Sequence, residues 1–436
     1  MSTRPGEPDS RSRVVGPSKP RLWKRFGPGL ITGASDDDPS GIATYSQAGA
    51  QFGFQLCWTL LFTYPLMVVI QAISARIGRT TGHGLAGNVR QHYPNWVLQI
   101  MVALLFAANT INIGANLAAM GEVTRLLAPG VAGWVYVGAF AVVCTAGQVF
   151  LKHTRYVAVL KWLTLSLFAY FVALFMINVP WREVMHSLVL PQFRADRDFW
   201  LMVVAVLGTT ISPYLFFWQA AQEVEDTKAK PRTTPLRNDP QQGPRALKRI
   251  RWDIAVGMGF SNLVALAIMI TTAATLYASG IHEVGSAAEA AEALRPVAGD
   301  RAFELFALGI IGTGLLSVPV LAGSAAYALG EARRWPVGLA RPPLQARAFY
   351  AAIALATFLG AAGTLMNMNP VRALVWAAVI NGVVAVPVMA LLLCLASNER
   401  VMGEFVIDRR WKVIGWCATA CMGAAACVFF LSFLTQ

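Results

Sequence analysis

The chain has 436 residues, of which 56% are hydrophobic and only 14% are charged. A soluble domain carries about a quarter charged residues, so this composition excludes an ordinary soluble protein and predicts an integral membrane protein. The net charge of +13 would suit a nucleic-acid-binding protein, but in a membrane protein the basic loops set the topology and contact anionic lipid. We therefore expect the lipid bilayer as a partner and no nucleic acid.

The remaining composition narrows the class further. Residues 1–25 are rich in Pro, Ser and Arg and have no apolar core, which is typical of a disordered cytoplasmic tail rather than of a cleaved signal peptide. The six cysteines lie in apolar segments without a CxxC pair, so small buried residues are expected rather than a disulfide framework or a zinc site. No nucleophile–base pair or phosphate loop is present, so neither an enzyme nor a bound cofactor is expected. Nothing in the sequence indicates an oligomer, and a monomer is the default expectation.

Runs of roughly 20 apolar residues predict about eleven membrane helices in an all-α protein. Every second loop is rich in Lys and Arg, whereas the loop between helices 7 and 8 is mainly acidic and the loop between helices 9 and 10 has no charge. Because cytoplasmic loops carry the basic excess, a cell-membrane protein with its amino terminus inside and its carboxyl terminus outside is predicted. The predicted helices span residues 27–53, 54–75, 96–120, 131–150, 156–179, 199–222, 254–278, 303–330, 346–362, 371–395 and 413–434.

The first helix carries Asp36-Asp37-Asp38-Pro39-Ser40-Gly41 at its centre. A carboxylate at bilayer depth costs a few kcal/mol, so such residues face a protein interior or a water-filled path. Pro39 removes a backbone donor and the following Ser-Gly pair loosens the next turn, which predicts a helix broken at Asp38. A carboxylate beside free carbonyls is a site for a hard cation. Asp36 and Asp37 are expected to point elsewhere, with at least one facing water or capping the second half-helix.

The sixth helix is interrupted at Ser212-Pro213 in the same way. Paired interruptions at matching positions of two halves indicate the binding site of a transporter built from inverted repeats. Five helices separate the two breaks, so the repeats have opposite orientation. We expect a first repeat over residues 26–180, a second over residues 198–395, and an additional helix over residues 409–436.

The polar residues near the two breaks are the candidate ligands. Asp38 is the main one, and Ser212 offers the matching hydroxyl oxygen in helix 6, with carbonyls near Thr209 exposed if the helix unwinds there. Tyr214 is a hydrogen-bonding group just past the break, or a packing residue. Ser40 and Thr44 are further path-lining candidates, with simple back-bonding within their helix as the equal alternative.

Three asparagines form a stripe along one face of helix 3, at spacings of three and four residues. Such a stripe lines a path or makes hydrogen bonds between helices, and the sequence does not separate the two readings. The same ambiguity holds for an asparagine in helix 10. The acids that end helix 6 are expected to be a solvated helix end, with an exit vestibule for cations as the alternative. The stripe in helix 3 consists of Asn109, Asn112 and Asn116, and the asparagine in helix 10 is Asn381. The acids at the end of helix 6 are Glu223, Glu225 and Asp226.

Residues 27–53, which include GPGL, DPSG and ATYSQAGAQFG, resemble the natural resistance-associated macrophage protein (NRAMP) family of divalent metal transporters. The resemblance continues at Gln71, at residues 75–78 (ARIG) and at Thr81-Gly82, and it covers most of the chain. It implies a LeuT-like 5+5 inverted-repeat fold, alternating access and a divalent metal cation bound between broken helices 1 and 6.

The departures from the family motifs bear on the metal. The family motif in helix 1 is Asp-Pro-Gly-Asn, and here Gly41 stands at the position of the Asn ligand. In helix 6 the family has an Ala followed by Met-Pro-His, and here Thr209, Ser212 and Tyr214 replace the Ala, the Met and the His. Loss of the sulfur favours hard cations such as Mg²⁺ or Mn²⁺ and resembles the NRAMP-related magnesium transporter branch.

Proton coupling in the family uses the helix 6 His and acids in helix 3, where this chain has Ala108 and Ile111. Transport without proton coupling, driven by the membrane potential, is therefore expected. Three alternatives stay open: a proton-coupled Mn²⁺ or Fe²⁺ symporter, an organic-solute transporter of the same fold, and a transport-inactive metal-binding relative.

Overall fold

The computed structural model describes residues 32–33, 35–150, 167–230, 233–366 and 369–432. The predicted tail and the first eleven residues of the predicted fifth helix, 156–166, lie outside these ranges. Within them the chain is helical and contains no strand. The main helices are α2 (Pro39–Phe52), α3 (Cys57–Thr81), α4 (Leu85–His92), α5 (Asn95–Leu127), α6 (Gly133–Phe150), α8 (Phe168–Met176), α9 (Trp181–Val189), α10 (Arg197–Thr210), α11 (Pro213–Ala229), α12 (Gly243–Thr272), α13 (Ala287–Glu292), α14 (Arg295–Ala298), α15 (Ala302–Arg333), α16 (Arg347–Gly363), α17 (Pro370–Ala396), α18 (Glu399–Met402) and α19 (Arg409–Ser432).

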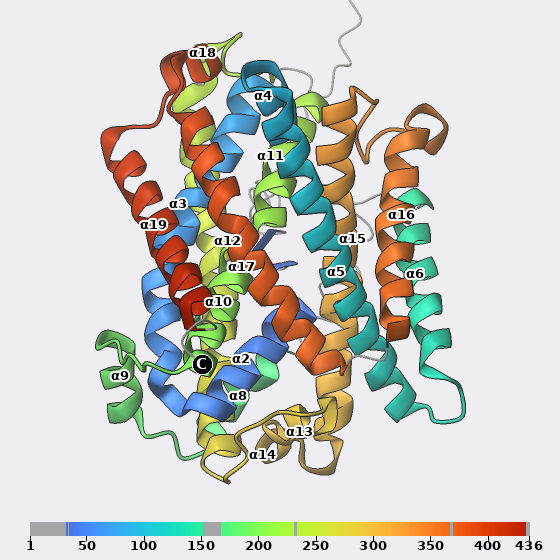
Figure 1. Cartoon of the computed structure of the whole chain (residues 1–436), viewed down its shortest axis with the longest axis vertical. Coiled ribbons are helices and arrows are strands. Elements are labelled where there is room, and N and C mark those ends of the chain that lie inside the picture. Colours follow the sequence, from blue (N-terminus) through green and yellow to red (C-terminus); the bar gives the residue numbers. More distant parts are fainter. Residues whose placement is uncertain (1–31, 34, 151–166, 231–232, 367–368, 433–436) are drawn as a thin grey trace, which may run out of the picture.

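The long helices run side by side along the long axis of the molecule (Figure 1). The short helices α4 and α18 lie at one end, and α9, α13 and α14 lie at the other. The half-length helices α2 and α10 occupy the half of the bundle next to α9, whereas α11 occupies the half next to α4. Helix α5 packs against α15, α16 and α17, and α10 packs against α17. The half-length helices therefore meet near the middle of the bundle.

The surface of the bundle exposes many large apolar side chains, and its interior is an apolar core that also encloses polar residues, as expected in lipid, where polar groups face the protein interior. Large side chains such as Phe150 and Phe175 are 81% and 88% exposed, while 39 polar or charged residues of the described part of the chain are buried. Eight helical stretches of the described chain are long and apolar enough to cross a membrane, and α16 is a shorter apolar helix. One of these stretches, Pro39–Thr81, contains α2 and α3, which were predicted as parts of two separate helices.

Helices α3 and α12 are among those that extend beyond their predicted ends into basic sequence. Helix α3 continues to Thr81, and α12 begins at Gly243, eleven residues before the predicted start at residue 254. The two arginines in the last turns of α3 are buried because backbone carbonyl oxygens accept hydrogen bonds from their guanidinium groups. Arg76 donates to the carbonyl oxygen of Val406 at 2.9 Å, and Arg79 donates to that of Thr234. These carbonyls come from distant parts of the chain, which the local sequence pattern does not reveal.

Candidate cation site at the two helix breaks

The break in the first helix lies where the sequence predicts it. Residues 35 and 36 are helical, and α2 begins at Pro39 with Asp38 as its N-cap. Oδ1 of Asp38 accepts hydrogen bonds from the backbone N–H of Gly41 at 2.8 Å and from the hydroxyl of Ser40 at 2.9 Å. A proline in the first turn costs no hydrogen bond, and an aspartate cap stabilises a helix by about 1 kcal/mol. Asp38 thus both starts α2 and presents its second oxygen, Oδ2, to the protein interior.

The break in the sixth helix has the same sequence pattern, but the side chain of Ser212 does not cap the helix that follows. Helix α10 ends at Thr210 and α11 begins at Pro213, with Ser212 in an extended conformation (φ −85°, ψ 130°) between them. The hydroxyl of Ser212 lies 2.6 Å from the carbonyl oxygen of Gly208 and 2.9 Å from that of Thr209. The carbonyls at this break are therefore already engaged by Ser212, although each keeps a second lone pair.

The two breaks are in contact with each other. The hydroxyl of Tyr214, the second residue of α11, donates to the carbonyl oxygen of Ser35 at 3.2 Å. Tyr214 is buried, so this bond joins the end of the first half of helix 1 to the start of α11. Tyr214 is therefore a hydrogen-bonding group that links the two breaks, and not only a packing residue.

Helix α5 supplies the amide groups around Asp38. Nδ2 of Asn116 donates to Oδ2 of Asp38 at 3.1 Å and lies 3.4 Å from the hydroxyl of Ser317 on α15. Asn112, one turn away on the same face of α5, also borders the Asp38 carboxylate. Asn112 is completely buried, and neither its Oδ1 atom nor that of Asn116 has a hydrogen-bond partner among the described residues. Two buried amide oxygens near one carboxylate thus accept no hydrogen bond within the described chain.

Asp36 and Asp37 do not face water, so the expectation that at least one of them would do so is wrong. They are 2% and 3% exposed and both approach the hydroxyl of Ser261 on α12, at 2.7 Å and 3.0 Å. Neither of them caps α2, because Asp38 itself does so. No Lys, Arg or His of the described chain forms an ion pair with any of these three acids.

The other predicted candidates have separate environments. Asn109 ties α5 to α15 by donating to the carbonyl of Leu321 at 2.9 Å and to Ser324 at 2.7 Å, as expected for a bond between helices. The hydroxyl of Thr209 back-bonds to its own helix, at the carbonyl of Val206. Thr44 is buried and makes no back-bond, and Asn381 is buried with its Oδ1 unpartnered within the described chain.

The site is buried within the helix bundle. Asp38 is 2% exposed. A Cβ atom on Gly33, in the first half of helix 1, would lie 2.3 Å from the carbonyl oxygen of Gly257 on α12. A Cβ atom on Gly208 of α10 would lie 2.5 Å from the backbone nitrogen of Gly382 on α17. Backbone-to-backbone contacts of this kind require glycine, and they bring α12 and α17 close to the two broken helices.

Two residues of this site gave no signal in the sequence. Ser317 and Ser261 are ordinary hydroxyl residues inside apolar helices, and they reach helix 1 only because α15 and α12 pack around it. Asn116 was visible in the sequence as one end of the asparagine stripe. The structure divides that stripe, with Asn112 and Asn116 at Asp38 and Asn109 at the neighbouring helix α15.

A bundle of membrane-length helices, two of them broken midway with a buried polar site between the breaks, defines a membrane protein of LeuT-like fold. A crystallised manganese transporter of Eremococcus coleocola, in complex with an aromatic bis-isothiourea substituted compound, is similar in fold. Its TM-score is 0.74 at 17% identity, over 97% of this chain and 89% of that one. MhsT in complex with L-phenylalanine is similar with a TM-score of 0.57 at 12% identity, over 93% of this chain and 98% of that one.

The family follows from the sequence match. The natural resistance-associated macrophage protein-like family matches residues 29–432. The chain therefore belongs to the NRAMP family of divalent metal transporters, as its helix 1 motif indicates.

Proposed function

We propose that this protein carries hard divalent cations, Mg²⁺ or Mn²⁺, across the cell membrane by alternating access, with Asp38 as the principal ligand. The observation that supports this most is the buried carboxylate of Asp38, held by Asn116 and without a basic partner in the described chain. A buried charge that no protein group neutralises is costly, and a bound cation removes that cost.

The available donor atoms favour a hard cation. Oδ2 of Asp38 and the free amide oxygens of Asn112 and Asn116 are all oxygen donors, which suit Mg²⁺, Ca²⁺ and Mn²⁺. Ser212 stands where other family members have a methionine, so its oxygen replaces a sulfur that favours softer metals. We propose that Thr209 and Gly41 are the remaining residues of the ligand shell at the two breaks.

We propose that uptake is driven by the membrane potential and not by protons. Helix α5 presents amides rather than acids to Asp38, and Tyr214 takes the place of a titratable histidine. An inside-negative potential supplies about 2.3 kcal/mol per charge per 100 mV, so a divalent cation gains about twice that value. The amino terminus inside, the carboxyl terminus outside, the repeats at 26–180 and 198–395, the additional helix at 409–436 and the monomeric state remain predictions.

Uptake into proteoliposomes tests the proposal. Purified protein is reconstituted with an inside-negative potential, and entry of Mg²⁺, Mn²⁺ and Cd²⁺ is followed with trapped indicators beside a trapped pH dye. Mg²⁺ entry that Mn²⁺ inhibits, without acidification, supports an uncoupled hard-cation site. Acidification with Mn²⁺ entry alone would instead identify a proton-coupled symporter, and binding without entry a transport-inactive relative.

A further inference from the structure

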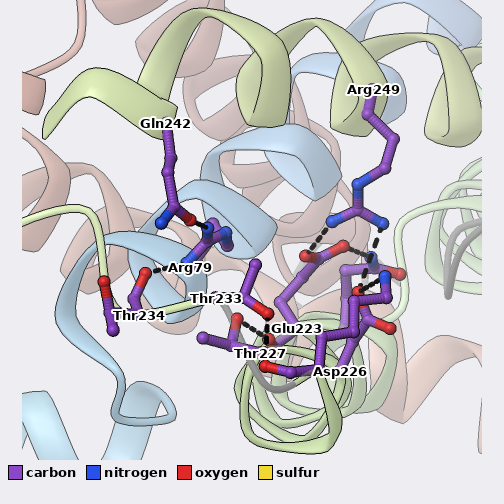
Figure 2. Close-up of polar contacts among 10 residues, drawn as sticks. Arg79, Glu223, Asp226, Thr227, Thr233, Thr234, Gln242 and Arg249 are labelled. Atoms are coloured by element: carbon purple, nitrogen blue, oxygen red, sulfur yellow. Dashed lines mark hydrogen bonds and ion pairs between the residues drawn. The ribbon is translucent and has the colours of Figure 1, made fainter. Parts of the chain in front are cut away.

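A buried ion pair lies at the end of α11 that is remote from the break. Glu223 is completely buried, and its Oε2 atom lies 2.5 Å from Nη2 of Arg249 on α12. Nη1 of the same guanidinium lies 3.7 Å from Oδ2 of Asp226. Figure 2 shows Arg249 reaching down from its helix between these two carboxylates. The expectation of a solvated helix end is therefore wrong for Glu223.

Polar groups connect this ion pair to the first helix. Nε2 of Gln219, one turn before Glu223, lies 3.5 Å from its Oε1 atom, and Oε1 of Gln219 accepts a hydrogen bond from Thr32 at 2.6 Å. On α12, Arg249 lies twelve residues, or about three and a third turns, before Ser261. Ser261 contacts the acids beside Asp38. A buried polar seam between helix 1 and α11 thus runs from Thr32, in the first half of the broken helix, through Gln219 to the Glu223–Arg249 pair.

A hollow opens on the other side of the ion pair. It has a volume of about 730 Å³, and its lining includes Arg249, Asp226, Lys230 and Arg79. The Arg249 side chain is 27% exposed, whereas that of Glu223 is fully covered. The guanidinium therefore forms the wall between the hollow and the seam. Arg79 is held beside it by Gln242 and by the carbonyl of Thr234 (Figure 2).

We propose that Glu223 is a second binding site for the transported divalent cation, and that Arg249 occupies this site as an internal cation while the path is closed. The cation leaving Asp38 follows the seam, displaces Arg249 from Glu223 and Asp226, and enters the hollow. Glu223 and Asp226 both pair with the guanidinium of Arg249. When the divalent cation replaces that guanidinium, neither carboxylate is left without a positive partner. Asp226 stays paired with Lys230 at 2.7 Å in either case. This inference rests on the proposed function for the identity of the cation.

Binding stoichiometry tests the second site directly, with Mn²⁺ as the probe in isothermal titration. Removing the internal cation by Arg249→Gln should free Glu223, so this variant should bind one more Mn²⁺ per chain than the wild type. The double variant Arg249→Gln with Glu223→Gln should lose that additional ion. Equal stoichiometry of Arg249→Gln and the wild type would overturn the proposal. If the wild type binds no Mn²⁺, the proposed site at Asp38 is refuted. The second site at Glu223 is still tested in that case, by comparing Arg249→Gln with the double variant.

A second measurement covers the case that Arg249→Gln does not fold with an unpaired buried carboxylate. Glu223→Gln keeps the shape of the side chain, and we expect it to slow cation uptake at least tenfold while the Kd at Asp38 changes less than twofold. Glu225→Gln is the matched control, because Glu225 bonds to Tyr327 and to the backbone of Leu339 on another side of α11. Unchanged uptake in Glu223→Gln, or an equal loss in the control, would overturn the proposal.

Discussion

The substitution Asp38→Asn separates the two roles that the structure gives to Asp38. Asparagine is as good an N-cap as aspartate, so the bond from the N–H of Gly41 to Oδ1 should persist and α2 should still begin at Pro39. The negative charge is lost. Asp38→Ala removes the charge and the cap together, so the two variants should bind cation equally poorly but differ in stability.

The expected loss of affinity is large. Two unit charges 4 Å apart attract by about 4 kcal/mol at an effective dielectric constant of 20, and a divalent cation doubles this value. Dehydration of the ion offsets much of the attraction, so we expect a net loss of about 3 kcal/mol or more, which is at least 100-fold in Kd. The missing cap should lower the free energy of unfolding of Asp38→Ala by about a further 1 kcal/mol. Isothermal titration with Mn²⁺ and thermal unfolding in detergent measure the two quantities.

A control comes from a second aspartate cap in the same protein. Asp196 caps α10 by accepting from the N–H of Asp198 at 3.3 Å and is exposed. Asp196→Asn should leave Mn²⁺ affinity and uptake unchanged. The reasoning is refuted if Asp38→Asn binds Mn²⁺ as tightly as the wild type, or if Asp196→Asn weakens binding to the same extent.

Three further substitutions probe the surroundings of the site. Asn116→Leu should weaken Mn²⁺ binding about tenfold, because it removes an amide that contacts the principal carboxylate, whereas Asn109→Leu should lower the melting temperature with little change in Kd. Ser212→Met should raise the affinity for Mn²⁺ or Cd²⁺ relative to Mg²⁺ in competition titrations, and an unchanged ratio would place Ser212 outside the ligand shell. Gly208→Ala should destabilise the protein by about 1–3 kcal/mol, because its Cβ would lie 2.0 Å from a carbonyl oxygen of α17, while Gly138→Ala, with no atom within 4 Å, should melt like the wild type.

The helix breaks could be predicted because their causes are local. At each break a proline follows a residue that favours the N-cap position, and both residues stand side by side in the sequence. The lengths of the apolar runs likewise predicted the membrane helices. The ends of α3 and α12 were missed because Arg79 and Arg249 are stabilised by groups outside their own helices, whereas arginines next to an apolar run normally mark a loop.

The surroundings of the acids could not be predicted because they depend on packing. Asp36 and Asp37 meet Ser261 from more than 220 residues away, and no periodicity links them. Glu223 has the sequence context of a solvated helix end and becomes buried only when α12 covers it. Asn116 could be identified as part of a stripe, but only the approach of helix 1 distinguishes it from Asn109.

The central claim is that a divalent cation binds at the break beside Asp38, and anomalous diffraction from crystals soaked in Mn²⁺ tests it most directly. We predict an anomalous peak within about 2–2.6 Å of Oδ2 of Asp38, close to the amide oxygens of Asn112 and Asn116, which is absent in Asp38→Asn. A peak that persists in that variant, or that lies away from both breaks, would contradict the assignment.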